Sequence, residues 1–426
     1  MSGEKRSQTR RSDRDETATE IEEGRTSSLG KGMAAVTALG LWLAVTLMVA
    51  QPAPGQTFKV LYTFTNGADG GNPEGNLLLH DGFLCGTTVN GGNGNGTVFT
   101  VDIQTRQETV LHTFAGEPSD GTQPLTGLIR DSVGNLYGTT NGGGADNFGI
   151  VFQMNVYSTL IVLHSFTNGA DGAAAEAVLA RDKAGNLYGT TYGGFGATGN
   201  GTVFKLDAER HLTTLHTFLG QPSDGAAPAA GLILSKGRLY GTTYFGGASN
   251  YGTVFEVNPN NQETKVLYSF TGGADGGYPQ SNLIADANGN LYGTTTLGAI
   301  SGPCPSGDGL AGCGVVFELN IASRQETVLY AFGGPDGAYP YAGLIRDSQG
   351  NLYGTTLFSS KGWGTAFELD TLGHLTTLHN FTNGADGGHP YAGLVRNASG
   401  KLFGATYEGG LVSGNPGAGT IFEIVP

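Results

Sequence analysis

A five-residue motif, Leu-Tyr-Gly-Thr-Thr, recurs along this chain at nearly constant spacing. Full copies begin at Leu136, Leu187, Leu239, Leu291 and Leu352, and degenerate copies begin at Leu84 and Leu402. The steps between successive copies are 52, 51, 52, 52, 61 and 50 residues. A period of about 20 to 50 residues is typical of architectures in which one structural unit repeats. The chain is therefore expected to contain seven copies of one unit.

Three other motifs accompany each copy, and all four have the character of short strands. They are rich in β-branched and aromatic residues, and polar and apolar residues alternate over short runs. No repeat contains a convincing helical pattern. Four antiparallel strands in about 50 residues correspond to one propeller blade. The sequence predicts an all-β fold, a seven-bladed β-propeller with four-stranded antiparallel blades, with a β-solenoid or a two-sheet fold as the alternative.

The two ends of the array predict how the ring closes. The repeats open at residues 58–64 with the strand type that ends each other unit, and they stop at 422–426 with the third strand type. Pairing these two strands would complete the seventh blade and remove the exposed sheet edges that an open array would leave. We expect the strand 58–64 to join the C-terminal blade, so that the propeller spans 58–426.

The composition limits the partners of this body. The chain has 36 acidic against 22 basic residues, a net charge of −14, which argues against a nucleic-acid partner because phosphate binding needs a basic face. Glycine supplies 74 of the 426 residues, without the every-third-residue order of collagen. A hydrophobic content of 38% is sufficient for a packed core.

The N-terminal residues form a separate part of the chain. Residues 1–32 are polar and mixed in charge, and we interpret them as a disordered leader. Residues 33–50 carry no charge and, as a helix, would extend about 27 Å. They are either a signal peptide or a membrane anchor helix, with 51–57 as a linker. Basic residues precede this run, so we expect the body to be exported: secreted, periplasmic or at the cell surface, with membrane contact only through 33–50 if they are not cleaved.

The order of the motifs carries a resemblance to a known family. Residues 271–295 hold Asp-Gly-Gly-x-Pro, an Asn-Leu-Ile-x-Asp form of the Gly-Leu-Ile-x-Asp motif, and Gly-Asn-Leu-Tyr-Gly-Thr-Thr. This pattern resembles the GloVer tandem-repeat family of exported bacterial proteins over about 58–426. The resemblance implies an exported, propeller-like body and supplies no activity and no catalytic residues. The chain departs from the pattern at Cys85, at Phe403 and Ala405, and at 173–175.

Each repeat also has an Asp-Gly pair before its first strand. We expect the seven carboxylates on one rim, where they are candidates for binding a ligand. The one cofactor that they could hold is Ca²⁺. The favoured alternative is a turn-forming Asp that recurs because the unit recurs, since each loop has a single carboxylate. No other metal or cofactor is expected. The seven residues are Asp69, Asp120, Asp171, Asp224, Asp275, Asp336 and Asp386.

Aromatic residues are expected on the same rim, and the strongest candidates are Tyr192, Tyr244, Trp363 and Tyr407. Such side chains stack on sugar rings or contact a partner protein, or else they wedge between blades. The histidines at one repeat position alternate with tyrosine, which favours a packed, hydrogen-bonded ring over catalysis or metal binding. That position is occupied by His112, His164, His216 and His379, and by Tyr62, Tyr268 and Tyr330.

The cysteines lie at two places. Cys304 and Cys313 fall within the one long insertion, 301–314, and an oxidising compartment would favour a loop-closing disulfide between them, with a metal or reactive pair as the alternative. Cys85 replaces a repeat tyrosine and is expected to be a buried free thiol. The insertion breaks the sevenfold pattern, so it is a candidate place for a blade-specific function.

These observations favour an exported, non-catalytic propeller that binds a glycan or protein partner through its loop-rich rim. An extracellular lyase or hydrolase acting on a glycan or lactone is the second hypothesis, and a cell-envelope structural module is the third. An enzyme on a propeller needs chemically unique polar groups that converge at the central channel. The polar groups of these repeats mostly recur, so we expect binding rather than catalysis.

Overall fold

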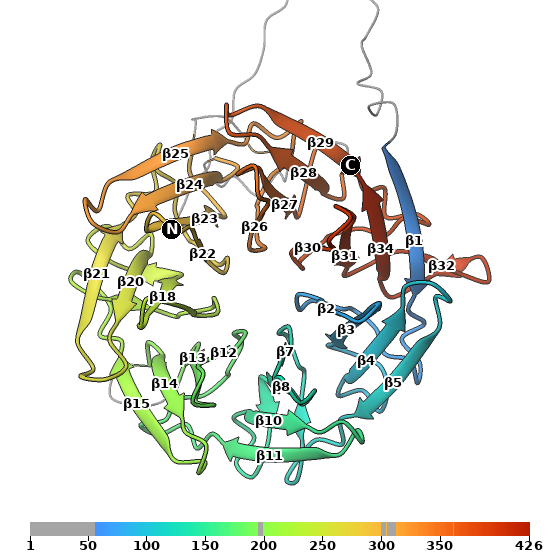
Figure 1. Ribbon diagram of the computed structural model, residues 1–426, viewed down its shortest axis with the longest axis horizontal. Coiled ribbons are helices and arrows are strands. Elements are labelled where there is room, and N and C mark those ends of the chain that lie inside the picture. The colour runs from blue at the N-terminus through green and yellow to red at the C-terminus, as the bar shows by residue number, and fades with distance from the viewer. Residues whose placement is uncertain (1–55, 195–198, 300–303, 305–311, 361) are drawn as a thin grey trace, which may run out of the picture. The chain divides into compact units, whose positions relative to one another are not determined.

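Seven antiparallel sheets surround a central axis (Figure 1). The computed structural model describes residues 56–194, 199–299, 304, 312–360 and 362–426, and the propeller lies within the unit Pro52–Pro426. The predictions for 1–32, for 33–50 and for most of the linker 51–57 lie outside the described residues. The fold is the predicted seven-bladed β-propeller. No helix within the described ranges is long and apolar enough to cross a membrane.

Each blade has four strands that follow one another from the axis outward, except that the outermost strand of the seventh blade comes from the N-terminal end of the propeller. The blades are β2 (Leu78–His80), β3 (Phe83–Thr88), β4 (Thr97–Asp102) and β5 (Glu108–Thr113); β7 (Ile129–Arg130), β8 (Leu136–Thr139), β10 (Ile150–Met154) and β11 (Leu160–Ser165); β12 (Ala180–Arg181), β13 (Leu187–Thr191), β14 (Thr202–Leu206) and β15 (Leu212–Thr217); β17 (Ile233–Ser235), β18 (Arg238–Thr243), β20 (Thr253–Val257) and β21 (Thr264–Ser269); β22 (Ile284–Ala285), β23 (Asn290–Thr295), β24 (Val315–Asn320) and β25 (Glu326–Ala331); β26 (Ile345–Arg346), β27 (Leu352–Thr356), β28 (Thr365–Leu369) and β29 (Leu375–Asn380); and β30 (Val395–Arg396), β31 (Leu402–Thr406), β34 (Thr420–Val425) and β1 (Thr57–Thr63).

The ring closes through β1, as the ends of the repeat array predicted. Strand β1 pairs antiparallel with β34 from Thr57 opposite Val425 to Thr63 opposite Thr420, and Figure 1 shows the two strands side by side. The ring of Phe58 also stacks on His379 of the sixth blade, with 3.7 Å between the ring centroids. The first and last strands therefore share one sheet, and β1 begins one residue earlier than expected.

The glycine of the Leu-Tyr-Gly-Thr-Thr motif makes room for a buried phenylalanine. In the fourth blade, Gly241 lies directly opposite Phe255, which is fully buried. A Cβ atom on Gly241 would stand 2.7 Å from Phe255 Cζ and 2.9 Å from Leu232 Cδ2. A mid-strand glycine allows a neighbouring group to approach closely, and here that group is an aromatic ring. The same pairing recurs in every blade.

The threonine after this glycine ties one blade to the next. Thr87 Oγ1 donates to Thr126 O at 2.8 Å, and the equivalent hydroxyls of the second to sixth blades donate to the segment that precedes the next innermost strand. In the seventh blade Ala405 has no hydroxyl to donate. The seventh and first blades are joined by another bond, in which Asn76 Oδ1 accepts the Gly393 N–H at 2.6 Å, and Asn282 Oδ1 accepts the Gly231 N–H in the same way between the fifth and fourth blades.

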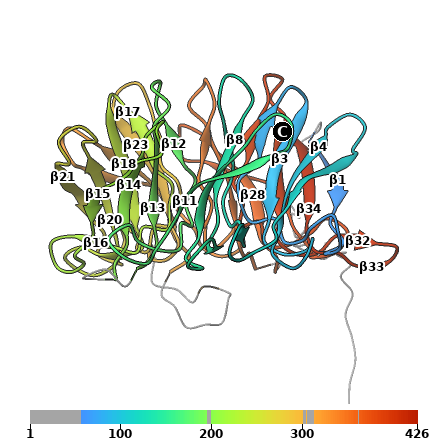
Figure 2. The ribbon, with the colours of Figure 1, turned by 90° about the horizontal axis from the view of Figure 1, so that it is seen from below.

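The two ends of the ring carry different connections. Hairpin turns join the first and second strands, and the third and fourth strands, at one end. The other end, which we call the loop face, carries the connections between blades, such as 114–128, and the loops between second and third strands, such as 140–149. In Figure 2 the loop face is the lower edge, where β16 (Gly225–Ala226) and β32 (Leu411–Val412) lie. The remaining short strands are β6 (Gly121–Thr122), β9 (Gly142–Gly143), β19 (Phe245–Gly246) and β33 (Asn415–Pro416).

Candidate functional site

The seven predicted aspartates are held in their own turns by the ring of the preceding strand. In each repeat the histidine or tyrosine near the end of the outermost strand contacts a carboxylate oxygen of the following Asp. The heavy-atom distances are 2.8 Å for His112–Asp120, 3.1 Å for His164–Asp171, 3.0 Å for His216–Asp224, 3.0 Å for His379–Asp386, 3.0 Å for Tyr62–Asp69 and 3.0 Å for Tyr268–Asp275, and Tyr330 donates to Asp336 in the same way.

Backbone N–H groups complete these turns. Asp224, for example, also accepts the N–H groups of Leu219 at 2.9 Å and Gly225 at 2.8 Å. Burial would raise the pKa of Asp224, but the bonds from His216 and from these two N–H groups lower it overall. The geometry has the features of a turn-forming Asp, and ligand binding by this set stays a prediction. Within the described ranges, no three His, Cys, Asp or Glu side chains gather as a metal site would require.

Replacing Asp224 with alanine is expected to destabilise the propeller by about 2–3 kcal/mol, because the His216 ring and two N–H groups lose their acceptor. Chemical denaturation followed by fluorescence measures the loss. The exposed Asp146 provides the matched control, and D146A should change stability by less than about 0.5 kcal/mol. Equal stability of D224A and D146A would contradict a turn-forming role.

A pocket lies on the axis, where the connections between blades turn into the innermost strands. It has a cavity volume of about 110 Å³ and opens to solvent. Its wall is built from one short segment of each repeat, between the conserved position of the Asp-Gly-Gly-x-Pro proline and the first strand. The residues directly after that position are Glu74, Leu125, Glu176, Ala229, Gln280, Tyr341 and Tyr391. Five residue types occur at this position, with Glu and Tyr twice each and Leu, Ala and Gln once each, whereas the residues on either side vary less.

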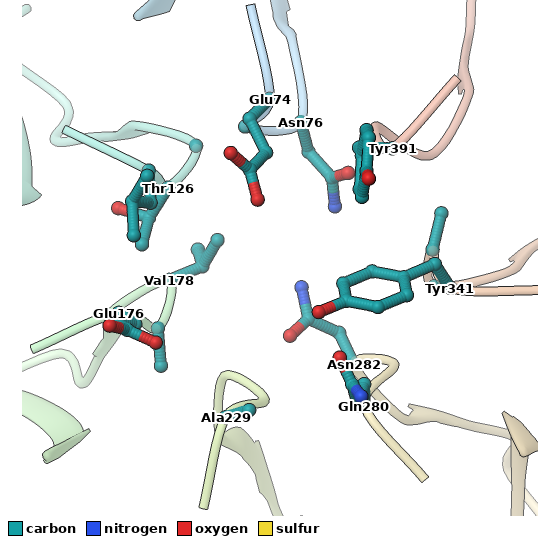
Figure 3. A pocket seen from close by; sticks show the side chains of 16 residues that line it. Glu74, Asn76, Thr126, Glu176, Val178, Ala229, Gln280, Asn282, Tyr341 and Tyr391 are labelled. Carbon is teal, nitrogen blue, oxygen red and sulfur yellow. The ribbon is translucent and has the colours of Figure 1, made fainter. Parts of the chain in front are cut away.

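Polar groups of different chemistry face this pocket (Figure 3). The carboxylate of Glu74, the hydroxyl of Tyr341 and the side-chain amide of Asn282 point toward its centre, with Glu176 and Gln280 on the wall. Asn282 also has a structural role, because its Oδ1 accepts the Gly231 N–H of the preceding blade at 2.5 Å.

The two carboxyl groups in the wall have raised pKa values. Burial raises the pKa of Glu74 to about 7, with an added effect from the charge of Glu176. Burial alone raises the pKa of Glu176 to about 7. Burial, followed by the charge of Glu74, raises the pKa of Tyr341 as well. Neither glutamate accepts a hydrogen bond or forms an ion pair with any residue that the structure describes.

Raised carboxyl pKa values make the stability depend on pH. Glu74, Glu108, Glu176 and Glu326 each have a pKa near 7 in the fold, against an ordinary value of 4.5. Their contribution is fully present below the unfolded value and is lost as the pH rises through 7. The melting temperature should therefore be higher at pH 5 than at pH 8. A Glu74→Gln/Glu176→Gln double variant should show a smaller fall over this range, and a melting temperature that rises from pH 5 to pH 8 would contradict these assignments.

Two of the four predicted aromatic residues, Tyr192 and Tyr407, lie beside the pocket. The charge of Glu74, after burial, raises the pKa of Tyr407, and that of Glu176 acts in the same way on Tyr192. Tyr391 packs edge-on against both Tyr341 and Tyr407, at centroid distances of 5.3 and 5.2 Å.

The other two predicted aromatic residues have different surroundings. Burial raises the pKa of Tyr244, and a hydrogen bond with the pocket residue Gln280 acts against this shift. Trp363 packs on His389 at 4.8 Å and does not line the pocket. The structure thus brings Tyr192, Tyr244 and Tyr407 toward the axis and leaves Trp363 farther out.

The pocket wall was missed by the sequence reasoning, which weighed residues that recur. The informative signal was a position at which the repeats differ from one another. The position after the proline changes between Glu, Leu, Ala, Gln and Tyr among the repeats, whereas the preceding residue is Pro in all but one repeat and the following residue is always small. Polar residues that do not recur therefore converge at the channel, as an active or binding site requires.

The structure joins Cys304 and Cys313 by a disulfide, with 5.3 Å between their Cα atoms. Most of the surrounding insertion lies outside the described residues, so its proposed blade-specific role stays a prediction. Cys85 is a free thiol, as expected, but it is only partly buried, and its Sγ lies 3.7 Å from Thr100 Oγ1.

Solved structures with a similar fold include enzymes. The oligogalacturonate lyase from Vibrio parahaemolyticus has a TM-score of 0.54 at 10% identity, over 87% of this chain and 97% of that chain. An oligogalacturonate lyase in complex with manganese gives 0.53 at 10% identity, over 87% and 96%. The xyloglucanase from Xanthomonas campestris gives 0.52 at 14% identity, over 82% of this chain and 52% of that one. At such identities the likeness shows the fold alone.

The protein is thus a member of the seven-bladed β-propeller class with a single axial pocket lined by residues that do not repeat, as far as the described ranges extend. A family model described as the Gloeobacter/Verrucomicrobia repeat matches residues 46–183, 159–303 and 298–426. The chain belongs to this repeat family. No curated protein matches it in sequence.

Proposed function

We propose that this protein is an exported glycan-binding propeller that takes a sugar residue into the axial pocket. The observation that carries the proposal is the convergence of non-recurring carboxyl, amide and tyrosine groups at that one place. Tyrosine faces stack on sugar rings, and carboxyl and amide groups bond to sugar hydroxyls. Export rests on the sequence pattern of residues 33–50.

The sugar-binding proposal differs in one respect from the sequence hypothesis. The rim aspartates are used by their own turns, so the binding groups are placed at the inner edge of the loop face. The similar folds include enzymes that act on polysaccharides by name, but the low identities transfer no activity to this chain.

Calorimetric titration of a panel of neutral, acidic and amino oligosaccharides tests the proposal. A binding glycan should lose at least about tenfold in affinity in a Tyr341→Ala variant, because the aromatic face in the pocket is removed. Tyr157→Ala is the matched control, since Tyr157 is 85% exposed on the β10–β11 hairpin at the opposite end of the blade. Equal losses in both variants would contradict binding at the pocket. Failure of every glycan to bind would favour the structural-module hypothesis.

A glycan-cleaving enzyme is the second candidate, and the raised pKa values of Glu74 and Glu176 favour it. Near neutral pH such carboxyl groups are populated in both the protonated and ionised forms, as a general acid and base require. Product analysis separates the two candidates. An enzyme releases shortened products that Glu74→Gln or Glu176→Gln abolishes while binding persists, and a binding protein releases none.

A further inference from the structure

The charges around the pocket narrow the class of glycan that it can bind. This inference rests on the proposed function. Glu74 and Glu176 stand in one cavity with no described partner for their oxygen atoms. A carboxylate that is taken out of water without a donor is unfavourable unless a ligand supplies a donor or a positive charge. Glu74 and Glu176 are both partly buried and line the same cavity, so a ligand there would meet two carboxyl groups that lack a donor.

The protein itself supplies no counter-charge there. The sixteen residues that line the pocket include no Lys, Arg or His. The charge of Glu176 acts on Glu74, and the charge of Glu74 in turn acts on three tyrosines of neighbouring blades, Tyr341, Tyr391 and Tyr407. Glu408 also acts on Tyr391 and Tyr407, and its carboxylate lies 3.3 Å from His389 Nδ1.

Aromatic rings frame the same space. The ring of Tyr341 projects into the pocket and that of Tyr391 stands at its edge, 5.3 Å from Tyr341 (Figure 3). A positive charge over the face of an aromatic ring is stabilised by the ring's quadrupole, and more so where water is excluded. Carboxylates and tyrosine faces together are a combination that recognises ammonium groups.

We propose that the bound glycan carries protonated primary amines, as an amino sugar does, and that its ammonium groups bind at Glu74 and at Glu176, with a sugar ring against the face of Tyr341. A uronate is disfavoured, because its carboxylate would find no Lys, Arg or His in the pocket wall and would oppose the ionisation of both carboxyl groups. An N-acetylated sugar fits the same stacking surface but offers no charge, so it provides the matched comparison.

Titration of the purified protein with a glucosamine tetramer and with an N-acetylglucosamine tetramer at pH 6 tests the inference. The amine-bearing tetramer is expected to bind roughly tenfold to a hundredfold more tightly, as charged hydrogen bonds do. Binding should also release protons, since the ammonium group favours the ionised form of carboxyl groups that are largely protonated at this pH. Calorimetry in two buffers of different ionisation enthalpy measures this release.

Two variants test the assignment to residues. Glu74→Gln and Glu176→Gln should each reduce the preference for the amine and the proton release, while binding of the N-acetylated tetramer persists. Glu209→Gln removes an exposed carboxylate from a hairpin turn and should change neither quantity. Melting curves of the glutamine variants should show no loss of stability, because each substitution removes a buried ionisable group.

The outcomes that would overturn the inference are distinct from failure of the proposed function. Equal affinity for the two tetramers without proton release overturns the amine preference and leaves glycan binding intact. The same holds if only a neutral or acidic glycan of the panel binds. Spermidine binding as tightly as the glucosamine tetramer overturns the amino-sugar assignment, since any polyamine would then suffice. Binding of no glycan at all overturns both proposals.

Discussion

Deletion of residues 57–63 is expected to abolish cooperative folding of the propeller. This strand pairs along the outer edge of β34, which would otherwise be exposed. Without β1 the seventh blade lacks its outermost strand, and the blades on either side lose their contacts with that strand. The expected loss is of the order of the total stability of a domain, about 5–15 kcal/mol. Thermal unfolding and size-exclusion chromatography measure the effect.

The matched control for this deletion is a variant that lacks residues 1–55 and keeps β1, which should melt at the temperature of the full chain. A milder change, Phe58→Ala, removes the ring stacked on His379 and beside Phe422. Because Phe58 is half-buried, we expect it to cost about 2–3 kcal/mol. An unchanged melting temperature after removal of 57–63 would show that the ring does not depend on β1.

Gly241→Ala is expected to destabilise the protein by about 1–3 kcal/mol, the usual cost of overpacking a core. The new methyl group would stand 2.7 Å from the buried ring of Phe255, which lies directly opposite in the next strand. Neither Phe255 nor Leu232 has free space to move away, since both are buried. Denaturant titration of the variant against the parent protein measures the difference.

Gly193→Ala is the matched control for Gly241→Ala. Nothing lies within 4 Å of a Cβ atom at Gly193, and its backbone does not need the left-handed conformation. We expect this variant to be as stable as the parent or slightly more so, because alanine restricts the unfolded chain. If both alanine variants were equally stable, the mid-strand glycine would have no packing role.

The fold could be predicted from the sequence because the same strand motifs occur seven times in the same order. One Gly-Phe pair or one terminal strand would be ambiguous alone, but seven equivalent spacings and complementary ends leave few alternatives. The chemistry of the glycine was harder to predict. Its opposite neighbour, Phe255, follows from strand register, which depends on the length of the connecting loop.

The pocket could not be predicted from the repeats in the same way. A repeat analysis gives weight to residues that recur, and the recurring Asp224 and His216 serve their own turn. Glu74, Glu176 and Tyr341 occupy one repeat position in three different blades, and only the closed ring brings them around one axis. Their raised pKa values follow from burial at that axis, which no local sequence pattern encodes.

A crystal structure of the protein with a bound oligosaccharide tests most directly whether the residues that break the sevenfold pattern form the binding site. Our account predicts a sugar ring against Tyr341, with polar contacts to Glu74 and Glu176. A ligand bound instead among the turns of Asp120, Asp171 and their equivalents, with the axial pocket free of sugar, would contradict it.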